Sequence, residues 1–411
     1  MNAEERHGAF SRGFAPNRDF DFDIRCVIGQ SFSGAADVGE VLAAVEHVGA
    51  KDHDGWFSAW WELGSRVFAN AEGSAAGDHQ ASAAAGYLRA ATYLGAATNA
   101  IASLRATDRL IPTYQAHRSA WEHFVDTTAV PVERVAIPYE TRTLPGYFFR
   151  PADDGQARAT LIMVNGSDAP VSAQWGNGGY GALTRGYNVL MFDGPGQGSM
   201  LFEEGTAFRY DWEAVITPVV DFLLRRSDVD PKRIAMYGVS QAGFWVPRAL
   251  AFEHRIAAAV ADPGVVDVSA SWIAHLPKSM VKLLNNGESE KFDKEMAFGM
   301  KFSGDAERAW NFRARPYQQD GYFATLAAVK RLTLGDEVAD ITTPLLITSP
   351  EDEQFWPGQS KRLAEMTSKV STLVEFTAAE GANFHCEPLA RALVDQRMFD
   401  WLDERMAPQR T

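Results

Sequence analysis

The feature that most constrains the fold is an alternation of short apolar runs with amphipathic stretches, which begins near Val130. The apolar runs have the length and the aliphatic composition of buried strands and occupy residues 159–165, 187–193, 233–239, 256–261, 344–349 and 372–376. Segments with helical periodicity lie between them, at 211–226, 241–251, 358–367 and 389–405. Strands that alternate with helices form a mostly parallel sheet covered on both faces, so the sequence predicts an α/β fold.

Two further segments, 132–138 and 144–150, predict a strand pair joined by a turn, which brings the expected sheet to eight strands. In residues 1–130 the pattern differs, because aromatic and aliphatic residues recur there at helical spacing and proline is scarce. We therefore expect a helical N-terminal cap domain over 1–130 and an α/β domain over 131–411.

One stretch within the expected α/β domain breaks the alternation. Residues from about 263 to 343 include helix-like segments, such as 279–284 and 290–300, but no strong strand. Ligands of open α/β sheets bind at the edge formed by the carboxyl ends of the strands. A long segment without strands therefore predicts a helical insertion over that edge.

The composition argues against several classes of function. The net charge is −14 and no basic run stands out, so nucleic acid is not an expected partner. The longest candidate for a membrane span, the uncharged stretch 90–104, is shorter than the roughly 20 apolar residues that a span needs, and no secretory signal is visible, so we expect no membrane partner. The two cysteines, Cys26 and Cys386, form no disulfide framework, which fits a cytoplasmic location.

A serine at a strand-to-helix junction carries the clearest chemistry. The expected strand 233–239 runs into Gly238-Val239-Ser240-Gln241-Ala242-Gly243, and a helix follows. A serine on such a turn is a nucleophile elbow, in which a strained backbone lifts the hydroxyl above the sheet. Ala242 replaces the usual second glycine of the motif, and Gly243 follows one position later. Ser240 is the candidate nucleophile, and the alternative is a serine that only caps the helix.

The other members of such a site follow in the chain order serine, acid, histidine. Only His385 of the nine histidines lies after position 352, in a loop before the last expected helix, so it is the candidate general base. The strand before that loop, 344–349, is followed by three consecutive acids. We expect Asp352 to be the acid, with Glu351 and Glu353 as its local competitors.

Backbone N–H groups are expected to stabilise the oxyanion that forms when the serine attacks a carbonyl. The candidates are Gly166 and Ser167, in the loop that follows an expected strand, and Gln241, which follows the nucleophile. A plain turn is the alternative for the first two. The glycine-rich segment 193–199 lacks the spacing and the lysine of a phosphate-binding loop, so we expect a tight structural loop at the rim of the site.

The aromatic content favours a bulky, apolar or aromatic small-molecule substrate. The candidate pocket residues are Trp60, Trp175, Phe244, Trp272 and Trp356, and ordinary core packing is the alternative for each of them. The sequence has neither an H-E-x-x-H pattern nor a dinucleotide-binding fingerprint. We therefore expect no metal and no cofactor.

The motifs together resemble the FrsA-like branch of the α/β-hydrolase superfamily, which includes 2,6-dihydroxypseudooxynicotine hydrolase and fungal polyketide-shortening hydrolases. The resemblance rests on Asp193-Gly194-Pro195-Gly196-Gln197-Gly198, on the serine motif 238–243, on a helix at 84–97 and on a hairpin at 132–150. It implies an α/β-hydrolase catalytic domain, the triad Ser240, Asp352 and His385, and a homodimer.

Three functions remain open from the sequence. The resemblance and the aromatic content favour a serine hydrolase that cleaves a C–C bond next to a ketone in an aromatic or polyketide-like substrate. A carboxylesterase that acts on a bulky apolar ester would use the same residues. The third possibility is a non-hydrolytic cyclase or dehydratase, or a binding protein, on the same fold.

Overall fold

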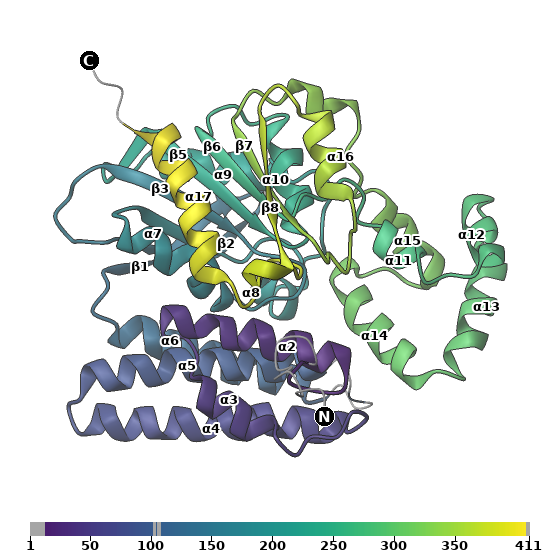
Figure 1. Ribbon diagram of the computed structural model, residues 1–411, viewed down its shortest axis with the longest axis horizontal. Coiled ribbons are helices and arrows are strands. Elements are labelled where there is room, and N and C mark those ends of the chain that lie inside the picture. Colours follow the sequence, from purple (N-terminus) through teal and green to yellow (C-terminus); the bar gives the residue numbers. More distant parts are fainter. Residues whose placement is uncertain (1–12, 102–103, 105–107, 408–411) are drawn as a thin grey trace, which may run out of the picture.

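The computed structural model describes residues 13–101, 104 and 108–407. Figure 1 shows a layer of helices from the N-terminal part of the chain beneath a twisted sheet with helices on its faces. The expected mostly parallel, eight-stranded sheet with an N-terminal helical region is confirmed. The order of the strands across this sheet decides which loops meet at the site.

The eight strands lie in the order β1-β2-β4-β3-β5-β6-β7-β8. Their bounds are β1 (Val132–Tyr139), β2 (Arg142–Phe149), β3 (Arg158–Val164), β4 (Asn188–Phe192), β5 (Val229–Val239), β6 (Ala258–Asp262), β7 (Leu345–Pro350) and β8 (Ser371–Phe376). β1 pairs antiparallel with β2, as β2 does with β4, and all other pairs are parallel. The carboxyl ends of β3 and of β5 to β8 therefore meet at one edge of the sheet.

Alternating residues of the strands pack against two different sets of helices. Leu161 and Met163 face the side covered by α7 (Tyr180–Thr184) and α17 (Arg391–Met406), whereas Ile162 and Val164 face the opposite side. The second face is covered by α9 (Glu213–Leu223), α10 (Ala242–Leu250) and α16 (Gln359–Met366), and the short α8 (Gly198–Phe202) follows β4. This two-residue period explains why the strands read as continuous apolar runs, since both faces are buried.

The N-terminal layer consists of α2 (Arg18–Gly29), α3 (Val38–Val45), α4 (His53–Ala76), α5 (Gln80–Ala100) and α6 (Leu110–Thr127). α5 packs between α4 and α6, which explains its long uncharged stretch, because a helix covered on several sides is apolar around most of its circumference. Among the described residues, no helix combines the length and the apolar character that a membrane crossing requires.

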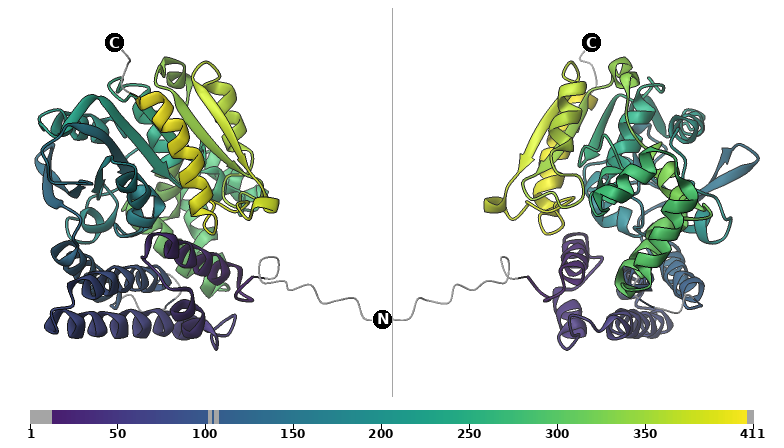
Figure 2. Two further views of the ribbon diagram at one scale, coloured as in Figure 1. Left: turned by 60° about the vertical axis from the view of Figure 1, so that its left-hand side comes forward. Right: turned by 90° about the vertical axis from the view of Figure 1, so that its right-hand side faces the viewer.

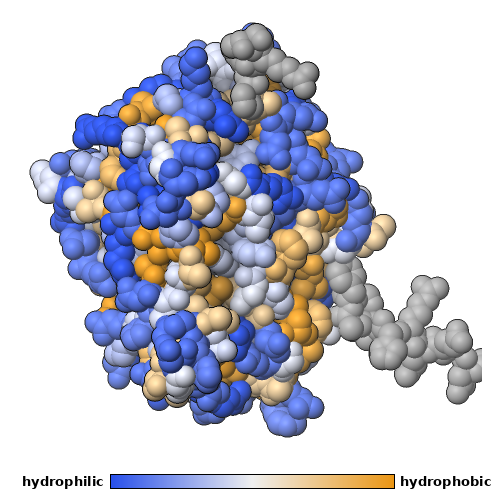
Figure 3. Space-filling view, turned by 90° about the vertical axis from the view of Figure 1, so that its left-hand side faces the viewer, coloured by the Kyte–Doolittle hydropathy of each residue, from blue (hydrophilic) through white to orange (hydrophobic). Residues whose placement is uncertain are grey.

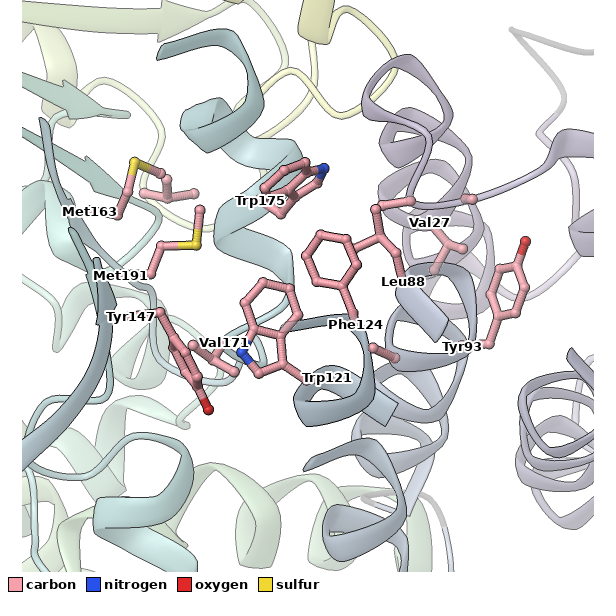
Figure 4. Close-up of a cluster of buried hydrophobic side chains, with 14 of the residues drawn as sticks. Val27, Leu88, Tyr93, Trp121, Phe124, Tyr147, Met163, Val171, Trp175 and Met191 are labelled. Atoms are coloured by element: carbon pink, nitrogen blue, oxygen red, sulfur yellow. The ribbon is translucent and has the colours of Figure 1, made fainter. Parts of the chain in front are cut away.

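The helical layer and the sheet share one hydrophobic core. Figure 4 shows Trp121 and Phe124 of α6 and Trp175 between strand residues on one side and helix residues such as Leu88 on the other. The Trp175 indole N–H donates to the Ser33 carbonyl at 3.2 Å, which adds a polar contact between the two regions. The helical layer is therefore docked onto the α/β region through buried contacts.

The segment expected as an insertion contains helices and no named strand of the sheet. Its helices are α11 (Ala270–Ile273), α12 (Lys278–Asn285), α13 (Ser289–Met300), α14 (Gly304–Ala314) and α15 (Tyr322–Lys330). They extend sideways from the sheet, and α14 returns toward the helical layer, as both figures of the ribbon show (Figures 1 and 2). A cavity of about 530 Å³ lies between the two regions, lined by Ile101 and Leu104 on one side and by Phe312 and Arg315 on the other.

Short single turns complete the structure. They are η1 (Gln30–Ser33), η3 (Trp175–Gly179), η4 (Arg315–Tyr317), η5 (Asp336–Asp340) and η6 (Ala378–Glu380).

On the face drawn in Figure 3, hydrophilic residues surround hydrophobic ones that gather mainly in its middle and lower parts.

Candidate active site

Ser240 stands at the end of β5 in the strained turn that the sequence predicts. Its φ angle is +59°, a left-handed conformation that few non-glycine residues adopt, and its N–H donates to the Asp262 carbonyl at 2.5 Å. The two glycines of the motif are required by close packing. A Cβ on Gly238 would lie 2.4 Å from a Val246 methyl carbon, and one on Gly243 would lie 1.8 Å from the Pro263 carbonyl oxygen. The tight contact thus falls at position 243, which explains why Ala242 is tolerated.

The loop after β8 places His385 against Ser240. The His385 Nε2 lies 2.9 Å from the Ser240 Oγ, within hydrogen-bonding distance. The His385 backbone N–H donates to the Gln354 side chain at 2.8 Å, and the imidazole packs against the Phe355 and Trp356 rings. The histidine is therefore held by contacts with the loop that follows β7.

The carboxylate that contacts His385 belongs to Glu353. Its two oxygens lie 2.8 and 3.0 Å from Nδ1, and it also accepts hydrogen bonds from the N–H groups of Phe355 and Trp356. Burial acts to raise the pKa of Glu353, but the His385 imidazole and these hydrogen bonds outweigh it, so the pKa lies below its usual value. An ionised carboxylate beside Nδ1 fixes the imidazole so that Nε2 can accept the serine proton.

The expectation that Asp352 would contact His385 is wrong. Asp352 is exposed, and its carboxylate accepts a hydrogen bond from the Asn383 amide at 2.6 Å. Its N–H also donates to the Asn383 carbonyl, at 2.8 Å. Asp352 thus ties the two loops together from outside, while Glu353, which was its competitor, turns inward. Three adjacent acids give no periodic signal that distinguishes the inward side chain.

Of the three residues expected at the oxyanion hole, Gly166 lies against Ser240 and Gln241 follows it directly in the chain. A Cβ on Gly166 would lie 3.0 Å from the Ser240 Cβ, so the backbone after β3 approaches the serine closely. The Gly166 N–H donates to the Asn165 side chain at 3.0 Å, which leaves it engaged. Within the described part of the chain, the N–H groups of Ser167 and Gln241 have no such acceptor. They are the better candidates to bind an oxyanion.

The glycine-rich segment after β4 supports this loop. The Gln197 amide donates to the carbonyls of Asn165 and Gly166 at 2.7 and 2.9 Å, and its oxygen accepts the Gly194 N–H at 2.9 Å. Asp193 accepts from the N–H and the hydroxyl of Ser199. The segment is the tight structural loop that the sequence predicts.

Three of the five aromatic residues proposed for the pocket are core residues. Trp60 and Phe244 have no exposed surface, so neither can touch a ligand. Trp175 packs against Phe124 and Phe149 in the shared core (Figure 4). Helical spacing and aromatic character do not distinguish a core residue from one that lines the site, and these three are core residues.

The other two aromatic residues lie nearer to the proposed site. The Trp356 ring is 5.6 Å from the His385 ring, and its indole N–H donates to the Val268 carbonyl. Trp272 packs beneath the Arg313 guanidinium at 4.4 Å. Both remain candidates for contact with a substrate.

Helix α2 contributes to the site, which sequence analysis missed. The Phe22 ring lies 6.3 Å from the His385 ring. Two turns later on the same face, a Cβ on Gly29 would lie 1.8 Å from the Pro388 carbonyl oxygen. α2 therefore packs directly on the histidine loop, and Figure 2 shows it on the side of the helical layer that faces the α/β region. No local signal in residues 18–29 indicates this long-range contact.

A buried polar cluster lies beneath the nucleophile. Tyr237 donates to the Asp262 carboxylate at 2.5 Å, and Arg391 donates to the Tyr237 hydroxyl at 3.0 Å. Glu387 has no exposed surface, and burial followed by the neighbouring Asp262 charge raises its pKa well above the usual value. Asp262 also accepts the Ser240 N–H through its carbonyl. The cluster therefore connects the nucleophile turn to the loop that carries His385.

The fold and the sequence identify the class of this protein. Residues 161–392, more than half of the chain, match the alpha/beta hydrolase family. The chain belongs to this family and is a hydrolase.

Several relatives match along almost their whole length. The chain is 27% identical to the hydrolase LUC6 of a Fusarium species, over 96% of this chain and 98% of that protein. It is also 27% identical to the 20-hydroxy-prefusarin hydrolase FUS2 of Gibberella moniliformis, over 98% and 99%. Among solved structures, 2,6-dihydroxy-pseudo-oxynicotine hydrolase is similar with a TM-score of 0.70 at 19% identity, over 92% and 96%. The expected relationship to α/β hydrolases is confirmed.

Proposed function

We propose that this chain is a serine hydrolase that cleaves a C–C bond next to a ketone, with Ser240 as nucleophile, His385 as base and Glu353 as acid. The observation that carries the proposal is the chain of contacts from the Ser240 Oγ to the His385 Nε2, at 2.9 Å, and from Nδ1 to Glu353, at 2.8 Å. This arrangement makes a serine hydroxyl nucleophilic at neutral pH.

The reaction begins when Ser240 attacks a carbonyl carbon of the substrate and His385 takes the hydroxyl proton. The negative oxygen of the tetrahedral intermediate accepts hydrogen bonds from the N–H groups of Ser167 and Gln241. Collapse of the intermediate breaks the C–C bond, and the protonated His385 delivers its proton to the leaving carbon. Water activated by His385 then hydrolyses the acyl-enzyme.

The preference for a C–C bond rests on the family relationships. One relative that matches along almost its whole length is named a 20-hydroxy-prefusarin hydrolase, and other fungal hydrolases match at 27–31% identity. The motifs 193–198 and 238–243 resemble the branch of the superfamily that cleaves such bonds. A carboxylesterase would use the same three side chains, so only turnover on substrates of both kinds distinguishes the two reactions.

Two measurements test the proposal. Mass spectrometry after treatment with a fluorophosphonate is expected to find an adduct on Ser240 that is absent from Ser240→Ala. Turnover is then compared on 2,2-dimethyl-1-phenylbutane-1,3-dione, a β-diketone, and on p-nitrophenyl butyrate. Cleavage of the diketone to acetate and isobutyrophenone, lost in Ser240→Ala, supports a C–C hydrolase.

The exposed Ser289 offers a matched control, because Ser289→Ala removes a surface hydroxyl far from the triad in sequence. It is expected to label and to turn over like the unchanged protein. A folded protein without an adduct on Ser240 would contradict the nucleophile, and turnover of the ester alone would replace C–C cleavage with esterase activity.

A further inference from the structure

The site has a buried side and an accessible side. His385 and Glu353 are buried, whereas Ser240 and Ser167 are partly exposed and Asp168 is exposed. Asp168 follows Gly166 by two residues, so it extends from the loop that contacts Ser240. The accessible side is where a substrate must approach the nucleophile.

A second carboxyl group reaches this side from α2. Asp23 directly follows Phe22, which packs near His385, and it is partly exposed. Phe20, Ile24 and Val27 of the same helix are buried in the core, and Asp23, three residues after Phe20 and four before Val27, stands at the edge of this buried stripe on the side of Phe22. Asp23 and Asp168 thus come from segments about 145 positions apart and lie close enough for the charge of Asp168 to act on Asp23.

These two acids lack the partners that acids near the core normally have. Among the described residues, neither forms an ion pair with a lysine or an arginine, although buried carboxylates are usually paired. The groups that face Asp23 are Asp168, Asp19, Cys26 and the Trp56 indole, and those that face Asp168 are Asp23, Cys26, Arg313 and His385.

Their surroundings favour the protonated form. Burial raises the pKa of Asp23 to about 8, the charges of Asp168 and Asp19 add to the rise, and the hydrogen bond from Trp56 opposes it. Burial also raises the pKa of Asp168, against the opposing effects of Arg313 and His385. A carboxyl group that is accessible and protonated can donate a hydrogen bond to a ligand.

C–C cleavage requires a donor that ester cleavage does not require. An ester releases an alcohol, which His385 protonates directly. A ketone substrate releases an enolate, whose negative charge rests largely on oxygen, so a second donor apart from the oxyanion hole lowers the barrier. Carboxylic acids that stay neutral at pH 7 stabilise such charges in other enzymes.

Resting on the proposed function, we propose that Asp23, supported by Asp168, donates a hydrogen bond as a neutral acid to the carbonyl oxygen of the leaving ketone. When the bond between the acyl carbon and its neighbour breaks, the electron pair passes into the enolate, and Asp23 stabilises its oxygen while keeping its own proton. The proton taken from Ser240 moves from His385 to the enolate carbon. The products are the acyl-enzyme, a ketone and a neutral His385 ready to activate water.

The test compares the two substrates in Asp23→Leu and Asp23→Asn. The diketone named above carries no proton on its central carbon, so its own ionisation does not obscure the pH profile. In Asp23→Leu the ratio of kcat/KM on the diketone to that on the ester is expected to fall about 10²-fold, as for loss of one charge-stabilising donor. Asp23→Asn keeps an N–H donor and is expected to recover part of this loss.

The pH profile separates a donor from a merely structural residue. In the unchanged protein, kcat/KM on the diketone is expected to fall as the pH rises through about 8, where Asp23 loses its proton. Asp23→Asn removes this alkaline limb. Asp168→Asn is expected to shift the limb to lower pH, because the charge of Asp168 no longer raises the pKa of Asp23.

Glu62, an exposed acid of α4 that is not among the groups facing Asp23, provides the control. Glu62→Gln is expected to keep both activities and their ratio, and circular dichroism verifies that every variant is folded. Equal losses on diketone and ester in Asp23→Leu, or an alkaline limb that persists in Asp23→Asn, would overturn the role of Asp23 and leave the Ser240 mechanism intact. Turnover of the ester alone by the unchanged protein would overturn both.

Discussion

Two carboxyl pairs flank Ser240, and they differ in what surrounds them. Beneath the nucleophile, Asp262 and Glu387 are fully buried, and Arg391 lies 3.7 Å from the Asp262 carboxylate. On the accessible side, Asp23 and Asp168 reach solvent and have no ion-pair partner among the described residues. The first pair is sealed from solvent and has an ion-pair partner, whereas the second is open to solvent and has none.

The difference shows what a raised carboxyl pKa does and does not indicate. Burial is the largest cause of the rise for Glu387 as well as for Asp23. Glu387 cannot meet a ligand, so its proton stabilises the turn that carries Ser240 and the loop that carries His385. Asp23 can meet one, so its proton is available for chemistry. Accessibility, rather than the pKa shift, separates a positioning group from a catalytic candidate.

The largest effect is expected where a buried carboxylate acts directly on His385. Glu353→Gln keeps the shape but removes the charge, so the imidazole is held less well in the productive tautomer. We expect kcat on any substrate to fall about 10³- to 10⁴-fold. Steady-state kinetics on p-nitrophenyl butyrate measures the effect.

Asp352→Asn is the matched control, since Asp352 is exposed and bonds to Asn383. It is expected to change kcat less than about threefold, in line with other surface substitutions. A larger loss in Asp352→Asn than in Glu353→Gln would contradict the assignment of the acid.

The fold was predictable from the sequence because the spacing of apolar residues along the chain can be recognised without knowledge of tertiary contacts. The apolar runs at 159–165 and 233–239 correspond to β3 and to the end of β5, and the strand-to-helix junction predicts the turn at Ser240. The chain order of the site then leads to His385, since no other histidine follows the strand that ends near 350. These inferences depend only on local pattern and on order along the chain.

The predictions that were wrong or missing concern the directions of side chains, which only tertiary packing determines. Glu353 rather than Asp352 turns inward, and a one-residue choice among consecutive acids has no local signature. Trp60 and Phe244, which were predicted to line the pocket, are fully buried and pack in the core. Asp23 lies in a helix more than 200 residues before Ser240, and only the packing of α2 on the histidine loop brings it to the site.

A loss of stability is expected when the buried pair of Asp262 and Glu387 loses the positive charge of Arg391. Arg391→Met removes the charge opposite Asp262 and the donor to Tyr237, which leaves an uncompensated buried carboxylate. Breaking a buried ion pair costs about 3–5 kcal/mol, so the melting temperature of a chain of this size is expected to fall by about 4–6 °C. Thermal unfolding followed by circular dichroism measures the change.

Arg405→Met, on the same helix, separates this effect from a general loss of charge. Arg405 pairs with the exposed Glu404 at 3.0 Å, and such surface pairs contribute about 0–1 kcal/mol. Equal melting temperatures for the two variants would indicate that Arg391 does not compensate the buried pair.

The smallest expected effect has the opposite sign and belongs to the open pair. Between about pH 4 and pH 8, Asp23 is ionised in the unfolded chain but protonated in the folded protein, because its folded pKa is raised from 3.8 to about 8. Folding then binds a proton, so this group's contribution to stability falls as the pH rises through that window. Asp23→Asn lacks this cost. At pH 8 it is expected to melt about 1–2 °C higher than the unchanged protein, which corresponds to roughly 1 kcal/mol for a chain of this size.

The pH dependence of this gain is the sharper measurement. The difference in melting temperature between Asp23→Asn and the unchanged protein should be close to zero near pH 4 and grow toward pH 8, whereas Glu62→Gln should show no such growth. A variant that gains stability while it loses diketone cleavage would show that the open pair is retained at the expense of stability, as strained catalytic groups are. A difference that does not change with pH would mean that Asp23 is already ionised in the folded protein, and the contrast between the two pairs would then lie in accessibility alone.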